Sequence, residues 1–120
     1  MKSFGEKCKE AICGVEKLPG WDEPIREIDE FISQYDPDYK VDQIKEKFGG
    51  LRFYFSLSKD HSLDSKTIDE IYRFVSEKEE ATMSICEQCG VDSKQQNRNM
   101  WISTLCDDCY EQRQKELNNG

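Results

Sequence analysis

The sequence predicts an α+β fold, with helices packed on a small antiparallel sheet and a zinc-ribbon-like lobe held by four cysteines at the C-terminal end. Residues 51–57 alternate apolar and polar side chains, which is the period of a strand with one buried face. Residues 22–35 and 65–75 instead repeat apolar side chains at helical spacing. Two C-x2-C pairs follow in residues 86–109.

We expect the first helix within WDEPIREIDEFISQY, residues 21–35. Asp22 is a suitable N-cap, because its carboxylate can accept hydrogen bonds from free backbone N–H groups. Pro24 is tolerated in the first turn, where a backbone N–H would have no partner within the helix. The predicted buried stripe consists of Ile25, Ile28, Ile32 and Tyr35. Residues 22–38 hold seven acidic side chains and one basic side chain, Arg26, so this segment carries most of the net charge.

The stretch VDQIKEKFGGLRFYFSL, residues 41–57, predicts an antiparallel β-hairpin. Its second strand has one apolar face, made of Leu51, Phe53, Phe55 and Leu57. Gly49 and Gly50 can supply the two positive-φ residues of a tight turn. The second strand would then pair with Val41–Phe48.

A second helix is expected to begin at Asp64 or Ser65, after a polar loop. Its apolar stripe consists of Ile68, Ile71, Tyr72, Phe74 and Val75. This stripe can lie across the apolar face of the hairpin. The chain then divides into an α+β body, residues 1–83, and a lobe with a final helix, residues 84–120, packed together as one unit.

The lobe contains C-x2-C, sixteen residues and a second C-x2-C, which is the spacing of a four-thiolate zinc site. The predicted ligands are Cys86, Cys89, Cys106 and Cys109. Gly90 suits the left-handed backbone that often follows such a turn. Four cysteines leave no open coordination position, so we expect one structural Zn²⁺. An iron–sulfur cluster shares this ligand set, and a redox pair remains an alternative that lacks its usual βαβ setting.

The remaining reactive side chains form no catalytic constellation. His61, the single histidine, stands in a polar loop without a partner at informative spacing. Cys8 and Cys13 have no neighbouring ligand, so we interpret them as packing residues. We therefore expect a protein that is not an enzyme.

The formal charge of −8 predicts repulsion of nucleic acid and anionic lipid and attraction to basic protein surfaces. Acidic residues also outnumber basic ones in the lobe, which disfavours direct nucleic-acid binding there. No run of about 18 apolar residues is present, and the start MKSFGEKCKE lacks the apolar stretch of a signal peptide. We expect a cytoplasmic protein without membrane contact, whose thiols favour metal over disulfides.

The stretch IKEKFGGLRFYF, followed by ICEQCG and LCDDC, resembles a family of small phage and bacterial proteins that share KEKFGGLRFY ahead of a paired-cysteine module. The similarity covers residues 41–57 and 84–110, and GWDEPI more loosely. Length, acidity and the cysteine lobe also resemble an anti-CRISPR protein of the type II-A class. This resemblance implies residence in a bacterial host cell and inhibition of a type II CRISPR RNA-guided effector nuclease.

Such an inhibitor would place acidic side chains on a positively charged channel of the nuclease and hinder the binding of target DNA. The candidate contact residues are Glu23, Glu27, Asp29, Glu30, Glu70 and Glu77. The alternative is an adaptor or immunity protein that uses the same acidic surface on another basic protein. An enzyme with a zinc-stabilised fold is a third possibility, which the missing constellation disfavours.

Overall fold

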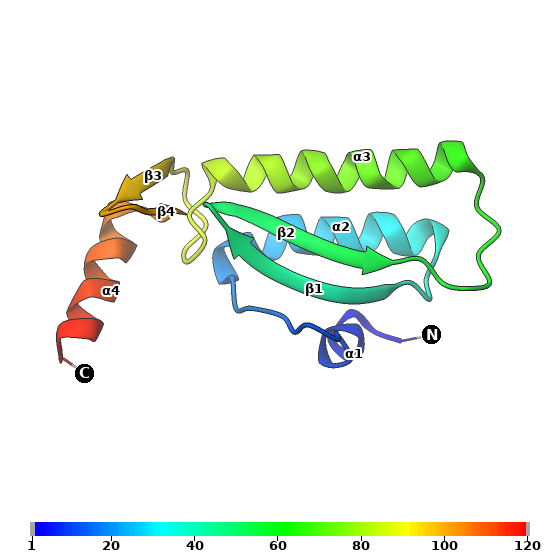
Figure 1. The fold of residues 1–120 in the computed structure, drawn as a ribbon, viewed down its shortest axis with the longest axis horizontal. Coiled ribbons are helices and arrows are strands. Elements are labelled where there is room, and N and C mark those ends of the chain that lie inside the picture. Colours follow the sequence, from blue (N-terminus) through cyan, green and yellow to red (C-terminus); the bar gives the residue numbers. More distant parts are fainter. Residues whose placement is uncertain (1, 120) are drawn as a thin grey trace.

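The computed structural model describes residues 2–119 and confirms the α+β prediction, with two two-stranded antiparallel sheets and four α-helices in that range. Figure 1 shows the elements in chain order. They are α1 (Phe4–Lys9), η1 (Pro19–Trp21), α2 (Asp22–Tyr35), β1 (Lys40–Lys47), β2 (Gly50–Ser56), α3 (Ser65–Ala81), η2 (Thr82–Ser84), β3 (Gln95–Arg98), β4 (Trp101–Thr104) and α4 (Asp107–Asn119). In residues 2–119, no helix is long and apolar enough to cross a membrane.

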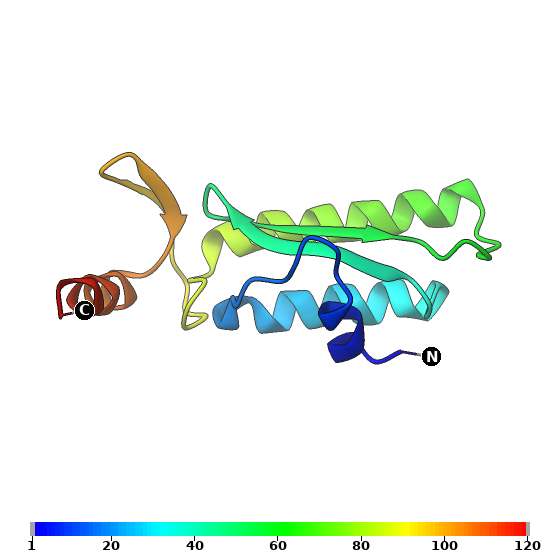
Figure 2. The same ribbon diagram turned by 60° about the horizontal axis from the view of Figure 1, so that its bottom comes forward.

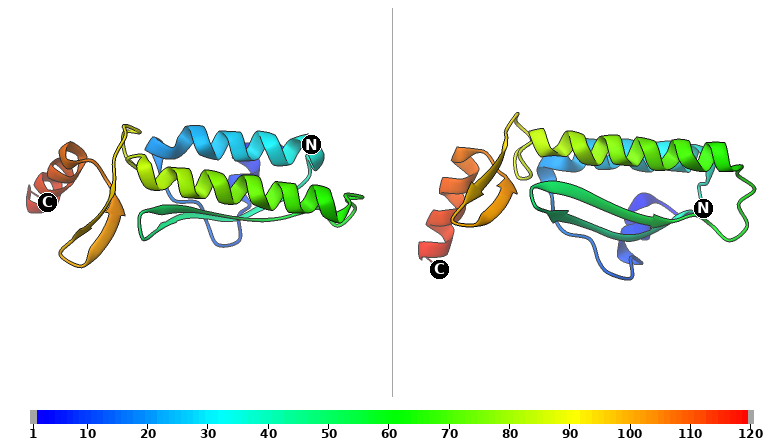
Figure 3. Two further views of the ribbon diagram at one scale, coloured as in Figure 1. Left: turned by 90° about the horizontal axis from the view of Figure 1, so that it is seen from above. Right: turned by 45° about the horizontal axis from the view of Figure 1, so that its top comes forward.

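The body, residues 2–83, has two layers. Helices α2 and α3 lie side by side on one face of the β1–β2 hairpin, as the left panel of Figure 3 shows. The predicted stripes form the core between the layers, with Ile28, Ile32 and Ile71 fully buried and Ile25 and Val75 nearly so. Tyr72 is an exception at 49% exposure, because it stacks on Phe55 from the edge of the layer.

The start of α2 differs from the prediction. Asp22 is the first helical residue and not the N-cap, and the N-cap position is taken by Trp21, which makes no side-chain capping bond. The cause is the turn of 3-10 helix η1, which runs directly into α2 and gives Asp22 helical backbone angles. An extended backbone, which a capping side chain needs, is therefore absent at Asp22.

The β1–β2 hairpin confirms the predicted strands but places the turn one residue earlier. Phe48 and Gly49 carry the positive φ angles, 55° and 85°, and Lys47 pairs with Gly50 across the turn. Gly50 is a strand residue, and its lack of a side chain leaves room for Met83, 3.2 Å from where a Cβ would stand. Only the first of the two glycines is thus required by the turn.

A bulge in β1 explains why its apolar residues do not alternate. The pairing shifts between Val41, opposite Phe55, and Gln43, opposite Tyr54. The extra residue lets Val41 and Ile44 both face the core, although they are three positions apart.

Part of each edge of the hairpin is covered. Along β1, the segment after α1 makes parallel contacts in which Glu16 N–H donates to Ile44 O at 2.9 Å and Ile44 N–H donates to Gly14 O at 3.2 Å. Along β2, Leu51 N–H donates to the Thr82 hydroxyl at 2.9 Å, and Phe53 N–H donates to the Glu79 carboxylate at 2.8 Å.

The cysteine lobe, residues 84–119, extends from the end of the body where the hairpin turns, so the molecule measures 51 × 26 × 22 Å. Figure 2 shows the β3–β4 hairpin and α4 beyond that turn. The two parts are joined at Gly49, whose carbonyl accepts a hydrogen bond of 2.6 Å from the Thr104 hydroxyl.

Candidate metal centre

The first cysteine turn follows η2 directly. Gly90 N–H donates to Cys86 O at 3.0 Å, and Cys86 N–H donates to Val91 O at 2.8 Å, which closes the turn around the first cysteine pair. Gly90 has a φ of 85°, which confirms the left-handed backbone expected there. The turn thereby brings Cys86 and Cys89 to the same side of the chain.

The second cysteine turn coincides with the start of α4. Cys106 immediately precedes the helix, and Cys109 lies in its first turn. Tyr110 N–H donates to Cys106 O at 2.9 Å. The helix N-terminus carries partial positive charge, which favours thiolates at this position.

The two turns meet, so the four predicted ligands form one cluster. The Sγ atoms of Cys86, Cys89, Cys106 and Cys109 all lie within 4.8 Å of one another. The Cys89 and Cys106 sulfurs are 3.7 Å apart. Four sulfurs at about 2.3 Å from one tetrahedral ion would be separated by about 3.8 Å. The cluster is therefore compatible with a single structural metal site.

The thiols of the cluster differ in pKa. Burial opposes ionisation of Cys86, but the backbone N–H groups of Cys106, Cys89 and Gln88 outweigh it and lower the pKa of this thiol to about 6. At Cys106 the N–H of Cys109 favours the thiolate, yet burial and the nearby thiols raise its pKa. Burial and the neighbouring thiols raise the pKa of Cys109 as well. One thiolate forms readily, whereas a cation is needed before the cluster carries its full negative charge.

Metal affinity is expected to rise with pH. At pH 7.5 Cys86 is ionised, whereas Cys106 and Cys109 still hold protons that the metal must displace. Below about pH 6 the metal-free protein holds a proton on Cys86 too, so binding then has to displace a further proton and the affinity falls again. Calorimetric titration with Zn²⁺ in two buffers of different ionisation enthalpy measures the displaced protons. Binding without proton release at pH 7.5 would contradict this ionisation pattern.

Without metal, the same shifts act on folding in opposite directions. The lowered pKa of Cys86 adds stability that is complete above the ordinary thiol value of 9.0 and is lost as the pH falls towards 6. The raised pKa values of Cys106 and Cys109 add stability that is complete below 9.0 and is lost as the pH rises.

The first cysteine turn is seated on the body through η1. Gly20 N–H donates to Glu87 O at 2.8 Å, and the Trp21 indole N–H donates to Ile85 O at 2.7 Å. The two backbones are so close that a Cβ on Gly20 would lie 2.0 Å from Cys86 O. The metal cluster and the body core, which contains the fully buried Trp21, are thus directly joined.

No local pattern in the sequence predicts this junction. Gly20 and Trp21 bind backbone groups that lie 67 and 64 residues further along the chain, at Glu87 and Ile85. A glycine beside a tryptophan at the start of an amphipathic helix was the available signal, since it indicates close backbone approach next to a large core side chain.

Most of the predicted acidic contact residues have partners within the chain. Glu23 and Glu30 both pair with Arg26, at 2.9 and 2.7 Å, and remain largely exposed. Glu27 pairs with Lys78 of α3 at 2.7 Å and is partly covered. The other three differ: Asp29 accepts hydrogen bonds from the hydroxyls of Tyr39 and Ser33, Glu70 is partly buried, and Glu77 is exposed.

Cys8, Cys13 and His61 lie apart from the metal cluster. Cys8 packs against the body core, as predicted, and burial raises its pKa. Cys13 is exposed, so the prediction of a packing role is wrong for this residue: its segment runs along the outer edge of β1. His61 accepts a hydrogen bond from Leu63 N–H at 3.2 Å within its own loop.

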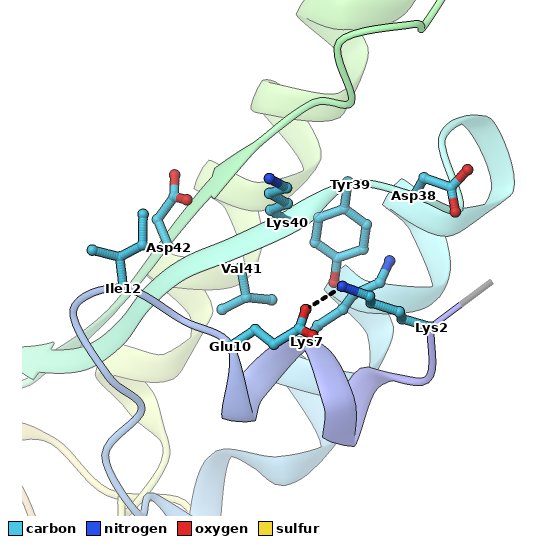
Figure 4. A pocket seen from close by; sticks show the side chains of 9 residues that line it. All are labelled: Lys2, Lys7, Glu10, Ile12, Asp38, Tyr39, Lys40, Val41 and Asp42. Carbon is cyan, nitrogen blue, oxygen red and sulfur yellow. Dashed lines mark hydrogen bonds and ion pairs between the residues drawn. The ribbon is translucent and has the colours of Figure 1, made fainter.

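A cavity of about 400 Å³ lies between α1 and the start of β1, and Figure 4 shows the residues around it. Lys7 is buried there, with its ammonium 3.8 Å from the centre of the Tyr39 ring, and burial lowers its pKa. Lys2 and Glu10 form an ion pair of 2.6 Å at the rim. The lining contains three lysines and three carboxylates, so it favours neither sign of charge.

No family model, curated protein or solved structure matches this chain. The chain's own residues define a site that could hold one metal ion. Any further function has to be argued from this site and from the placement of charge on the fold.

Proposed function

We propose that this protein is a non-enzymatic, zinc-stabilised inhibitor that binds a type II CRISPR effector nuclease through the acidic layer formed by α2 and α3. The bound protein would occupy a positively charged channel of the nuclease and hinder the entry of target DNA. In this proposal the metal supports the fold, and recognition depends on charge.

The observation that carries the proposal is the concentration of acidic side chains in one layer. Helices α2 and α3 together contain ten acidic and four basic residues, a formal charge of −6 out of −8 for the whole chain. Both helices lie on the same face of the hairpin (Figure 3), so most of this charge belongs to one layer of the molecule, although the Glu79 carboxylate turns to β2 and accepts from Phe53 N–H. Such a field favours fast association with a basic surface.

The acidic residues of the layer contribute differently to this surface. The carboxylates best placed for a partner are those of Glu23, Glu30 and Glu77, because their side chains are exposed. The pairing of the first two with Arg26 is an exposed contact that contributes little stability, so a partner can replace it. Asp29 is less suited, since its carboxylate already holds Tyr39 and Ser33.

We assign Zn²⁺ to the cysteine cluster. Four thiolates in a closed tetrahedral arrangement are the ligand set of structural zinc sites, and Cys86 is completely buried. An iron–sulfur cluster would need larger sulfur–sulfur separations across its several metal atoms, and it would give the purified protein a visible colour. All four sulfurs lie within 4.8 Å of one another, which supports a single ion.

A binding and cleavage assay tests the proposal. The purified protein is expected to bind the guide-loaded nuclease, to protect target DNA from cleavage, and to bind more weakly as salt increases. Changing Glu23, Glu30 and Glu77 together to glutamine is expected to weaken binding about tenfold. The readouts are the dissociation constant and the fraction of DNA cleaved.

The matched control carries Asp92→Asn, Glu111→Gln and Glu116→Gln, three exposed acidic residues of the lobe. It has the same net charge as the α2–α3 variant but is expected to bind like the wild type. Equal weakening in both variants would mean that overall charge, and not this layer, decides binding. Absence of binding at moderate salt, together with capture of a different basic protein from host cells, would favour the adaptor or immunity role.

A further inference from the structure

The lobe contains a second cavity, of about 360 Å³, between the β3–β4 hairpin and α4. This volume is at the small end of the range for small-molecule sites. The lining includes Arg98 and Arg113 but no carboxylate, although the chain has 25 acidic residues. The cavity is therefore a local exception to the negative character of the protein, and it differs from the charge-balanced cavity beside α1.

Arg98 has hydrogen-bonding capacity that the described residues do not use. Its Nη2 donates to Leu105 O at 2.9 Å and to the Asp107 carboxylate at 3.0 Å. Its guanidinium lies over the Tyr110 ring, 4.4 Å from the centroid. Nη1 is buried and has no hydrogen-bond partner among the side chains that the structure describes, which end at residue 117. A buried donor without an acceptor is unfavourable, so an incoming acceptor at this atom would be stabilising.

The existing partners of the two arginines leave room for a ligand. Asp107, which pairs with the largely buried Arg98, has an 83% exposed side chain, and water weakens an ion pair on its exposed side. Arg113 is 42% exposed and reaches Glu87 at 3.3 Å, a long contact. Arg98 is thus paired with an exposed carboxylate and Arg113 with a buried one at long distance, and each guanidinium keeps further N–H groups for another acceptor.

An exposed indole completes the site. Trp101 also lines the cavity and is 68% exposed, whereas Trp21, the other tryptophan of the chain, is completely buried. A large aromatic side chain left in water at the mouth of a cavity can stack on a planar ring. The site thus combines a cationic wall with an aromatic one.

We propose that this cavity binds a small anionic ligand that carries a planar ring, such as a nucleoside monophosphate. The anion would contact Arg98 and Arg113, and the ring would lie against Trp101. Because Nη1 is closed off from water, binding includes a side-chain movement that opens a path to this atom. This site is independent of the docking face proposed on α2 and α3.

Three probes separate the two parts of the ligand. The metal-loaded full chain is titrated with adenosine monophosphate, with adenosine and with inorganic phosphate, using tryptophan fluorescence and calorimetry. Saturable quenching by adenosine monophosphate is expected, with at least about tenfold weaker binding of either fragment. Equal binding of adenosine would overturn the anion assignment, and equal binding of phosphate would overturn the ring assignment. The absence of saturable binding at about 10 mM would overturn the site itself.

Two variants locate the binding in the lobe. Arg98→Lys keeps the charge but removes the guanidinium donors, and it is expected to weaken adenosine monophosphate binding about tenfold. Arg73→Lys on the exposed face of α3 is the matched control and is expected to bind normally. If the Arg98→Lys variant loses its metal, its lobe is no longer intact and its affinity does not test the site. The Trp101→Ala variant then provides the test, because the Trp101 side chain is exposed and its removal leaves the core unchanged. Unaltered affinity in Trp101→Ala would overturn the assignment.

Discussion

Replacing Cys86 with serine is expected to remove stoichiometric metal from the protein and to unfold the cysteine lobe. Cys86 is the fully buried member of the cluster and the one whose thiolate forms most readily, with a pKa of about 6. Structural zinc contributes about 10–16 kcal/mol of apparent binding free energy in small zinc domains at neutral pH. The lobe has few buried apolar side chains of its own and cannot replace this contribution.

Elemental analysis and hydrogen exchange measure this effect. The wild type should hold one zinc per chain and protect the amides of β3 and β4, and Cys86→Ser should do neither. Cys13→Ser is the matched control, because Cys13 is exposed and lies outside the cluster. One zinc per chain in the Cys86 variant, with protection of the β3–β4 hairpin unchanged, would show that these sulfurs do not hold the lobe.

Replacing Gly20 with alanine is expected to destabilise the protein by about 3 kcal/mol or more, at the upper end of overpacking effects. The new Cβ would lie 2.0 Å from Cys86 O and 2.7 Å from the backbone of Glu87 and Gly90. These are backbone atoms of the metal-binding turn, which cannot rotate away as a side chain would. Relief of the clash must separate the turn from η1 and break the hydrogen bond between Trp21 and Ile85.

Gly5→Ala provides the comparison for this prediction. A Cβ at Gly5 meets nothing closer than the Ser3 hydroxyl at 3.8 Å, so its effect is expected to stay within about 1 kcal/mol of the wild type. Denaturant unfolding gives the free energies, and competition with a chelator gives the metal affinity. Gly20→Ala should lower both the free energy of unfolding and the metal affinity. If neither changed, the metal-binding turn would not pack against Gly20 as described.

Local patterns in the sequence were sufficient for the β1–β2 hairpin, the two long helices and the metal cluster, whereas strand β3 was not predicted. Each depends on spacing within a short stretch: alternation in Leu51–Phe55, helical repeats in Ile25–Ile32, and the paired cysteines. Each of these spacings fits one local backbone conformation: a strand, a helix or a metal-binding turn. Even so, the turn position was missed, because Phe48 takes a left-handed conformation that a bulky residue rarely adopts.

Long-range contacts explain what the sequence could not provide. The hydrogen bonds from Gly20 and Trp21 to the first cysteine turn join residues that are far apart in the chain. The burial of Lys7 beneath Tyr39 likewise depends on where α1 packs, and α1 itself was not predicted. The acidic residues of α2 can be read from the sequence, but the ion pair of Glu27 with Lys78 appears only once α2 and α3 are placed side by side.

The covered margins of the β1–β2 hairpin limit how other chains can approach it. Backbone groups that would otherwise be available for strand addition are occupied by residues 13–16 on one margin and by Thr82 and Glu79 on the other. Intermolecular strand addition, a common route to fibrillar aggregation, is therefore hindered along these stretches of β1 and β2. A partner that approaches the covered stretches has to recognise side-chain chemistry, because these backbone groups are already occupied.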